Sequence, residues 1–71
     1  MAKEINESVA ILRRRQVEVR TGLSRSSIYA FMSAGNFPKP VHLGPRAVGW
    51  LEIEISQWLG AQIEQSRRGT T

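Results

Sequence analysis

The sequence predicts one small, mostly helical domain: two short helices joined by a tight turn, then a β-hairpin and a last helix. Three observations support this fold class. The chain has only 71 residues, about half the length of a typical domain. A glycine and a serine separate two helical patterns in its first half, and a segment bounded by prolines alternates like a hairpin in its second half. A chain this short buries only ~60% of its unfolded surface, which argues against a large enclosed pocket and a second domain.

The first residues are expected to lie outside the folded unit. Residues 1–8 are polar and show no periodicity, so we predict a flexible N-terminal arm. The apolar run at 9–12 fits either a strand or the start of a helix, since periodicity cannot separate the two in so short a run. The domain is expected to span 9–63, and residues 64–71 are expected to form a flexible basic tail.

The next segment has the features of a helix-turn-helix. Residues 14–21 suit a short helix, and Gly22 is placed to end it in the left-handed conformation. The hydroxyl of Ser24 can accept a hydrogen bond from a free backbone N–H at the start of a second helix. Pro38 limits that helix, because the residue before a proline is pushed toward extended geometry. Two helices joined by three residues that include a glycine are typical of a helix-turn-helix.

The second helix has two different faces at 100° per residue. One face is apolar and is expected to pack on the first helix; it carries Ile28, Phe31, Met32 and Ala34. The opposite face is small and polar, with Arg25 at its margin; it carries Ser26, Tyr29, Ala30 and Ser33. Small residues allow close approach to a groove, and hydroxyl groups reach phosphates and base edges. This pattern favours nucleic-acid contact over an ordinary solvated face, which usually carries more Glu and Lys.

A hairpin is predicted after the second helix. Pro38 and Pro40 are compatible only with an edge strand, and the turn Gly44-Pro45 separates two apolar segments, with Arg46 near the tip. An exposed basic hairpin after such a helix is a wing, and it can also act as a flap that closes the core. The predicted fold class is therefore a winged helix-turn-helix.

The last segment, 51–63, contains two conflicting patterns. Its first five residues alternate like a strand, but Trp58-Leu59 fits no alternation and the pattern extends beyond ten residues, so we predict a helix. Ile53 then points away from the helix's apolar face. Trp50 and Trp58 are expected in the core, because so small a domain needs large apolar side chains there.

The charge is concentrated in the middle of the chain. The formal net charge is +4 and the pI is near 10.8. Residues 13–46 contain seven basic residues and one glutamate, a net of +6, whereas each flank has a net of −1. Such clustering is typical of a surface that binds a polyanion. A solvated basic face without a partner is the alternative.

The residue inventory argues against catalysis. The chain has no cysteine and no aspartate, which excludes disulfides, thiolate zinc sites and a cysteine nucleophile. The single histidine, His42, has no aspartate to orient it. Glu52 and Glu54 would diverge by about 200° on a helix and cannot share a proton or a metal. We therefore expect no enzyme activity, no cofactor, no metal and no small-molecule substrate.

No membrane association is expected either. No apolar run approaches the ~20 residues that span a bilayer, and the first residues do not resemble a signal peptide. A cytoplasmic, nucleoid-associated location is the resulting expectation.

Three motifs in order carry a family resemblance: the stretch TGLSRSSIY at 21–29, FPKPV at 37–41 and LGPR at 43–46. Together they resemble the AlpA family of small phage and prophage regulators over roughly residues 11–63. That family is similar to excisionases and to MerR-type winged helix-turn-helix proteins. The resemblance implies DNA binding with transcriptional or excision control. It also implies that residues 24–29 open the recognition helix and that residues 39–46 form the wing.

The sequence departs from the family pattern in two places. Arg14 and Arg15 stand where family members often have a Leu-Pro or Leu-Lys pair, so the start of the first helix is more basic here. Leu51 and Ile53 are apolar where other members are commonly polar. These two residues are either a self-association surface or scattered exposed apolar side chains, which need no explanation.

The sequence thus predicts a sequence-specific regulator of phage type that binds double-stranded DNA, together with further copies of itself. The base-edge contacts are expected from Arg25, Ser26 and Ser27, next to Ser24, because the first residues of a recognition helix reach deepest. The phosphate contacts are expected from Arg14, Arg15, Tyr29, Lys39, His42 and Arg46. Two alternatives remain: an excisionase-like factor that bends DNA for a recombinase, and a protein-interaction module for an acidic partner.

Overall fold

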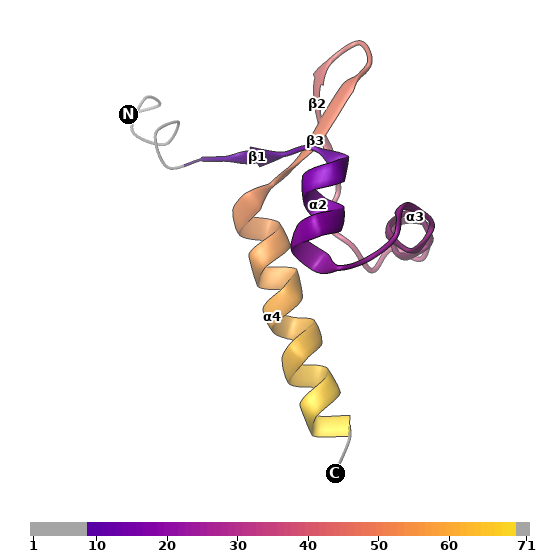
Figure 1. Cartoon of the computed structure of the whole chain (residues 1–71), viewed down its shortest axis with the longest axis vertical. Coiled ribbons are helices and arrows are strands. Elements are labelled where there is room, and N and C mark those ends of the chain that lie inside the picture. The colour runs from indigo at the N-terminus through magenta and orange to yellow at the C-terminus, as the bar shows by residue number, and fades with distance from the viewer. Residues whose placement is uncertain (1–8, 70–71) are drawn as a thin grey trace.

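The computed structural model describes residues 9–69, and the predicted arm at 1–8 lies outside the described residues. Within this range the chain is mostly helical, with a small antiparallel sheet, as predicted (Figure 1). The elements in chain order are β1 (Ile11–Leu12), α2 (Arg14–Thr21), α3 (Arg25–Ser33), β2 (Val41–Gly44), β3 (Ala47–Leu51) and α4 (Glu52–Gly69). No helix in this part of the chain combines the length and the apolar character needed to cross a membrane.

The helix-turn-helix forms from the predicted local signals. Gly22 adopts φ 75° and ends α2, with its N–H bonded to the carbonyl oxygen of Glu18 at 2.8 Å. Ser24 caps α3 by accepting a hydrogen bond from the N–H of Ser27 at 3.2 Å. Ile28 is completely buried. The prediction that Ala34 faces the core is wrong: it is exposed, because α3 ends at Ser33 and the chain turns away there.

The sheet contains the predicted hairpin and one further strand. β3 lies in the centre, with β2 on one side and β1 on the other, both antiparallel. The ambiguous run at 9–12 provides this third strand: Ile11 pairs with Leu51 and Leu12 pairs with Trp50. Pairing with β3 therefore decides between strand and helix, and the local pattern could not.

The last helix differs from its predicted bounds at both ends. Leu51 is the final residue of β3, so α4 begins at Glu52. The helix continues to Gly69, and residues 64–69, expected as a tail, form its last turns. An ion pair between Glu64 and Arg68 at 3.2 Å supports these turns, and basic residues at a helix C-terminus interact favourably with its dipole.

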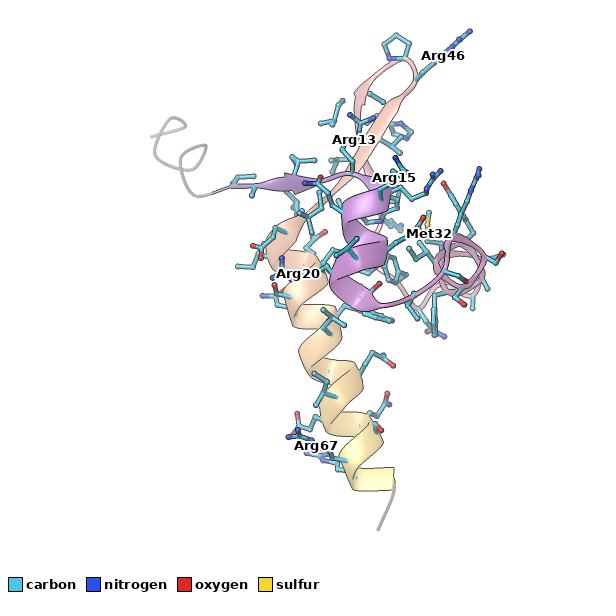
Figure 2. The ribbon with its side chains drawn as sticks, in the orientation of Figure 1. Arg13, Arg15, Arg20, Met32, Arg46 and Arg67 are labelled. Carbon is cyan, nitrogen blue, oxygen red and sulfur yellow. The ribbon has the colours of Figure 1, made fainter. Side chains whose placement is uncertain are left out.

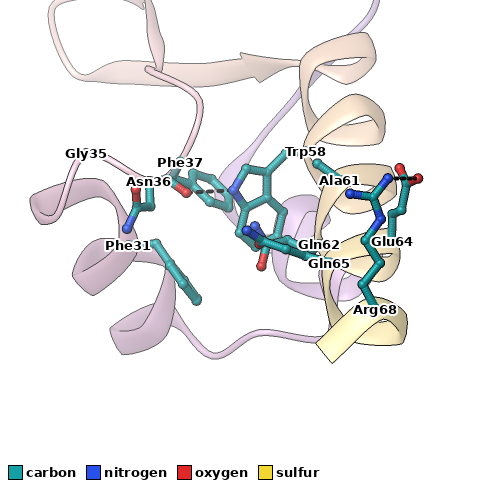
Figure 3. A pocket seen from close by; sticks show the side chains of 10 residues that line it. All are labelled: Phe31, Gly35, Asn36, Phe37, Trp58, Ala61, Gln62, Glu64, Gln65 and Arg68. Carbon is teal, nitrogen blue, oxygen red and sulfur yellow. Dashed lines mark hydrogen bonds and ion pairs between the residues drawn. The ribbon is translucent and has the colours of Figure 1, made fainter. Parts of the chain in front are cut away.

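The core lies where the two halves of the chain meet. Its buried members come from the three helices, β3 and the segment before β2: Val17, Ile28, Phe37, Trp50 and Ile55. Trp50 is fully buried as predicted, and its indole N–H donates to the carbonyl oxygen of Pro38 at 3.1 Å. Trp58 is only partly buried at the edge of this core. Figure 3 shows its indole N–H donating to the carbonyl oxygen of Asn36, at 2.6 Å, beside the ring of Phe37.

Candidate nucleic-acid interface

The outward face of α3 is small and polar, as the sequence predicted. Ser26, Tyr29, Ala30 and Ser33 are exposed, as is Arg25 at their margin. Figure 1 shows α3 end-on beside α2, with the β2–β3 hairpin projecting past the N-terminal end of α2. The outward face of α3 and the tip of the β2–β3 hairpin are therefore two separate projections from the domain.

Three serines lie at the start of α3: Ser24 and Ser27 hydrogen-bond to each other, and Ser26 lies on the outward face. The hydroxyl of Ser24 donates to Ser27 Oγ at 3.1 Å while accepting from the Ser27 N–H. Ser27 is also partly buried. Both hydroxyls are therefore engaged in capping the start of α3. Arg25 and Ser26 are exposed, as is Ser24.

Arg25 is held along the outward face by the residue one helical turn later. Its guanidinium carbon lies 5.8 Å from the centre of the Tyr29 ring. A cation at this distance from an aromatic face is attracted by the ring quadrupole. The contact places the Arg25 guanidinium beside the Tyr29 ring on this face.

A basic hollow joins the three elements. We use this name for the cavity of about 400 Å³ lined by Arg13, Arg14, Arg15, Tyr29, Arg46 and Val48. Figure 2 shows Arg13 and Arg15 at the N-terminal end of α2 and Arg46 at the hairpin tip. The structure brings together four of the residues predicted to contact phosphates, from segments up to 32 positions apart. Arg13 was not among the predicted contacts, although the arginine run that begins with it is a visible signal.

The electrostatics of the basic hollow are strongly positive. None of the lining residues is acidic, and the N-terminus of α2 adds partial positive charge. Glu18 partly offsets this charge, because it accepts from Arg14 Nε at 3.1 Å. This arrangement suits a phosphate group, since guanidinium groups bind phosphate through charge-assisted hydrogen bonds.

The other two predicted phosphate contacts lie outside the lining of the basic hollow. His42 is exposed and pairs in register with Val48, so both side chains share one face of the hairpin, next to the hollow. Lys39 is exposed beside a smaller cavity, near Met32 and Pro40. Among residues 9–69 no group of three or more His, Cys, Asp or Glu side chains is placed to hold a metal ion.

Comparison with known proteins gives a consistent family. The family described as prophage CP4-57 regulatory protein (AlpA) matches residues 10–63. The DNA-binding transcriptional activator AlpA of Escherichia coli K12 is 40% identical over 63 residues, covering 80% of this chain and 90% of that protein. The uncharacterized protein ORF88 of Enterobacteria phage P4 is 44% identical over 48 residues, covering 68% of this chain. The chain spans about half the length of the phage protein, 54%.

Proposed function

The chain belongs to the AlpA family of prophage regulatory proteins, and from this premise we propose that it binds double-stranded DNA and regulates transcription. The observation that carries the proposal is the position of the basic hollow directly beside the outward face of α3, with Tyr29 belonging to both. A DNA duplex presents both partners for such a surface: base edges in the major groove and phosphates along its margin.

In this proposal α3 is the recognition helix. Its first turn enters the major groove, where Arg25 and Ser26 read base edges. Ser24 and Ser27, which the sequence also suggested, then hold the turn in shape through their mutual hydrogen bonds. The exposed Ala30 and Ser33 support this role, because their small side chains allow the helix backbone to approach the groove closely.

The wing and the basic hollow then position the protein on the backbone. Arg13, Arg14, Arg15, Tyr29 and Arg46 line the hollow, and in this proposal their side chains would hold a phosphate at the edge of the groove. His42 lies on the same face of the hairpin, and Lys39 would contact a phosphate farther along. Such contacts supply affinity and register but little sequence information.

The proposal is tested by selecting duplex sites from a random pool with the purified chain and titrating the best site by fluorescence anisotropy. A specific regulator should bind its selected site at least ~10³-fold more tightly than random duplex. Random duplex and polyglutamate serve as competitors. Failure of selection, with polyglutamate competing as well as DNA, would overturn the proposal and favour an acidic protein partner.

The same selected site distinguishes regulation from an architectural role. The site is placed at different positions in DNA fragments of equal length. If the protein bends the site, the complexes of these fragments migrate with different gel mobilities. Unchanged mobility is expected for a regulator that binds without strong bending. A large mobility difference would favour the excisionase-like alternative.

A further inference from the structure

The last helix is longer than its contacts with the domain require. α4 has 18 residues, so it is about 27 Å long at 1.5 Å per residue. Its core residues lie in the first half: Ile55 is buried, and Trp58 and Leu59 pack against the core. Figure 1 shows the second half extending away from the other elements. A helix of this kind gains most of its stability from packing an apolar face, and the second half has little to pack against in this chain.

A partly apolar stripe follows α4 on the side away from its core residues. We define the α4 stripe as Ile53, Gly60, Ile63 and Arg67, which lie within about 80° of one another around the helix at 100° per residue. Ile53 is 62% exposed and Ile63 is 49% exposed. Nothing lies within 4 Å of the position where Gly60 would carry a Cβ, so another backbone can approach closely there. Arg67 and Arg20 both lie on the side of α4 away from α3 (Figure 2).

The charges at the two ends of α4 favour a second copy of this helix, in antiparallel orientation, as the partner that packs on the stripe. On the side of the stripe, the first turn carries Glu52 and the last turn carries Arg67, whereas Glu54 lies on the other side of the helix and Arg68 is paired with Glu64. A second α4 in antiparallel orientation would place its Arg67 near Glu52 of the first helix, and the symmetric contact would form as well. Its helix dipole would oppose the first one as well, which is favourable. A parallel pair would instead place like charges side by side.

We propose that two copies of this chain associate through the α4 stripe, with their last helices antiparallel. Pairing centred near residue 58 brings Ile53 of each copy against Ile63 of the other, with Gly60 close to the crossing point. Glu52 keeps its contact with Arg20, since a carboxylate can accept from more than one guanidinium. Of the two residues that the sequence suggested for self-association, Ile53 belongs to this interface. Leu51 does not, because it ends β3 and pairs with Ile11.

Cysteine cross-linking in the full chain tests both the contact and its orientation, since the native sequence has no cysteine. Ile53→Cys and Ile63→Cys variants are mixed without DNA, oxidised mildly and analysed by mass spectrometry. The mixed 53–63 disulfide is expected to form several-fold faster than either homodisulfide. Dominant 53–53 and 63–63 products would show a parallel pair, and equal slow formation of all three would show no specific contact. Either result overturns the proposal.

Sedimentation equilibrium provides a second readout with a matched control. Ile63→Glu places a charge in the stripe and should weaken dimerisation at least ten-fold. Gln65→Glu introduces the same charge at an exposed position on another side of α4, and should leave dimerisation unchanged. A wild-type chain that is monomeric at every concentration, or equal effects of the two variants, would contradict the proposal. Because no DNA is present, the result is independent of the proposed function.

Discussion

Arg20, in the last turn of α2, donates a hydrogen bond to a carboxylate oxygen of Glu52, in the first turn of α4, at 2.5 Å. The same guanidinium donates to Ser56 Oγ at 2.9 Å. This ion pair joins the helix-turn-helix to the last helix. It also removes one arginine from the basic surface, although the sequence counts Arg20 in the central charge cluster.

The Arg20–Glu52 pair should make stability depend on pH. The hydrogen bond and the charge of Arg20 hold the pKa of Glu52 below its ordinary value of 4.5. Because the pKa of Glu52 is lower in the folded state than in the unfolded state, the ion pair's contribution to stability is fully present above pH 4.5. It is lost as the pH falls through the pKa that Glu52 has in the folded state. The Tm difference between wild type and Glu52→Gln should therefore shrink below pH 4.5.

Arg20→Gln provides the control for this prediction. In that background, Glu52→Gln should have a smaller effect on Tm, and the effect should depend less on pH, because the interacting cation is gone. Thermal unfolding of the four chains, followed by circular dichroism across the same pH range, gives the comparison. An unchanged pH dependence in the Arg20→Gln background would show that another group is responsible.

Gly49 should not tolerate a side chain. A Cβ at this position would overlap the side chain of Ile11 and lie 3.0 Å from the carbonyl oxygen of Leu12, so Gly49→Ala forces β1 away from β3. Overpacking of this kind costs about 1–3 kcal/mol, measurable by urea unfolding. Gly44→Ala, in the same hairpin, meets only Ala47 Cβ at 4.0 Å and should change stability much less. Equal effects of the two variants would mean that β1 does not constrain Gly49.

The elements that the sequence predicted correctly are those with a local cause. Gly22 and Ser24 end and begin helices through their own backbone and hydroxyl groups, so neighbouring residues suffice to identify them. β1 is different, because only its pairing with β3 makes it a strand. Phe37 was missed as a core residue for a similar reason: it is buried by Trp50 and Trp58, which lie far along the chain.

The candidate interface shows the same division. The run of arginines indicates a basic surface, but the sequence does not show which guanidinium groups remain available. Tertiary contacts decide this: Arg20 is bound by Glu52, whereas Arg15 and Arg46 both line the basic hollow. The convergence of residues from α2, α3 and the hairpin depends on the packing of three elements, which no local spacing encodes.

The salt dependence of DNA binding should distinguish these arginines. If ~4–5 basic residues neutralise phosphates, log K should fall with log salt at a slope near −4. Arg15→Ala should make the slope shallower by about one unit, because it removes one phosphate contact. Arg20→Ala removes the same charge but should leave the slope unchanged. A wild-type slope shallower than about −1, or equal changes in the two variants, would show that the basic hollow is not the DNA surface.

Arg25 and Arg46 should differ in the kind of contact that they make. Arg25 lies in the first turn of α3, where its guanidinium can pair with a guanine edge, a contact that discriminates by ~1–3 kcal/mol. Arg25→Ala should therefore weaken the selected site far more than random duplex. Arg46→Ala, at the wing tip, should weaken both by similar factors and make the salt slope shallower by about one unit. Anisotropy titrations of both variants on both duplexes, at two salt concentrations, measure this difference. If Arg46 carried the specificity instead, the wing rather than α3 would be the reading element.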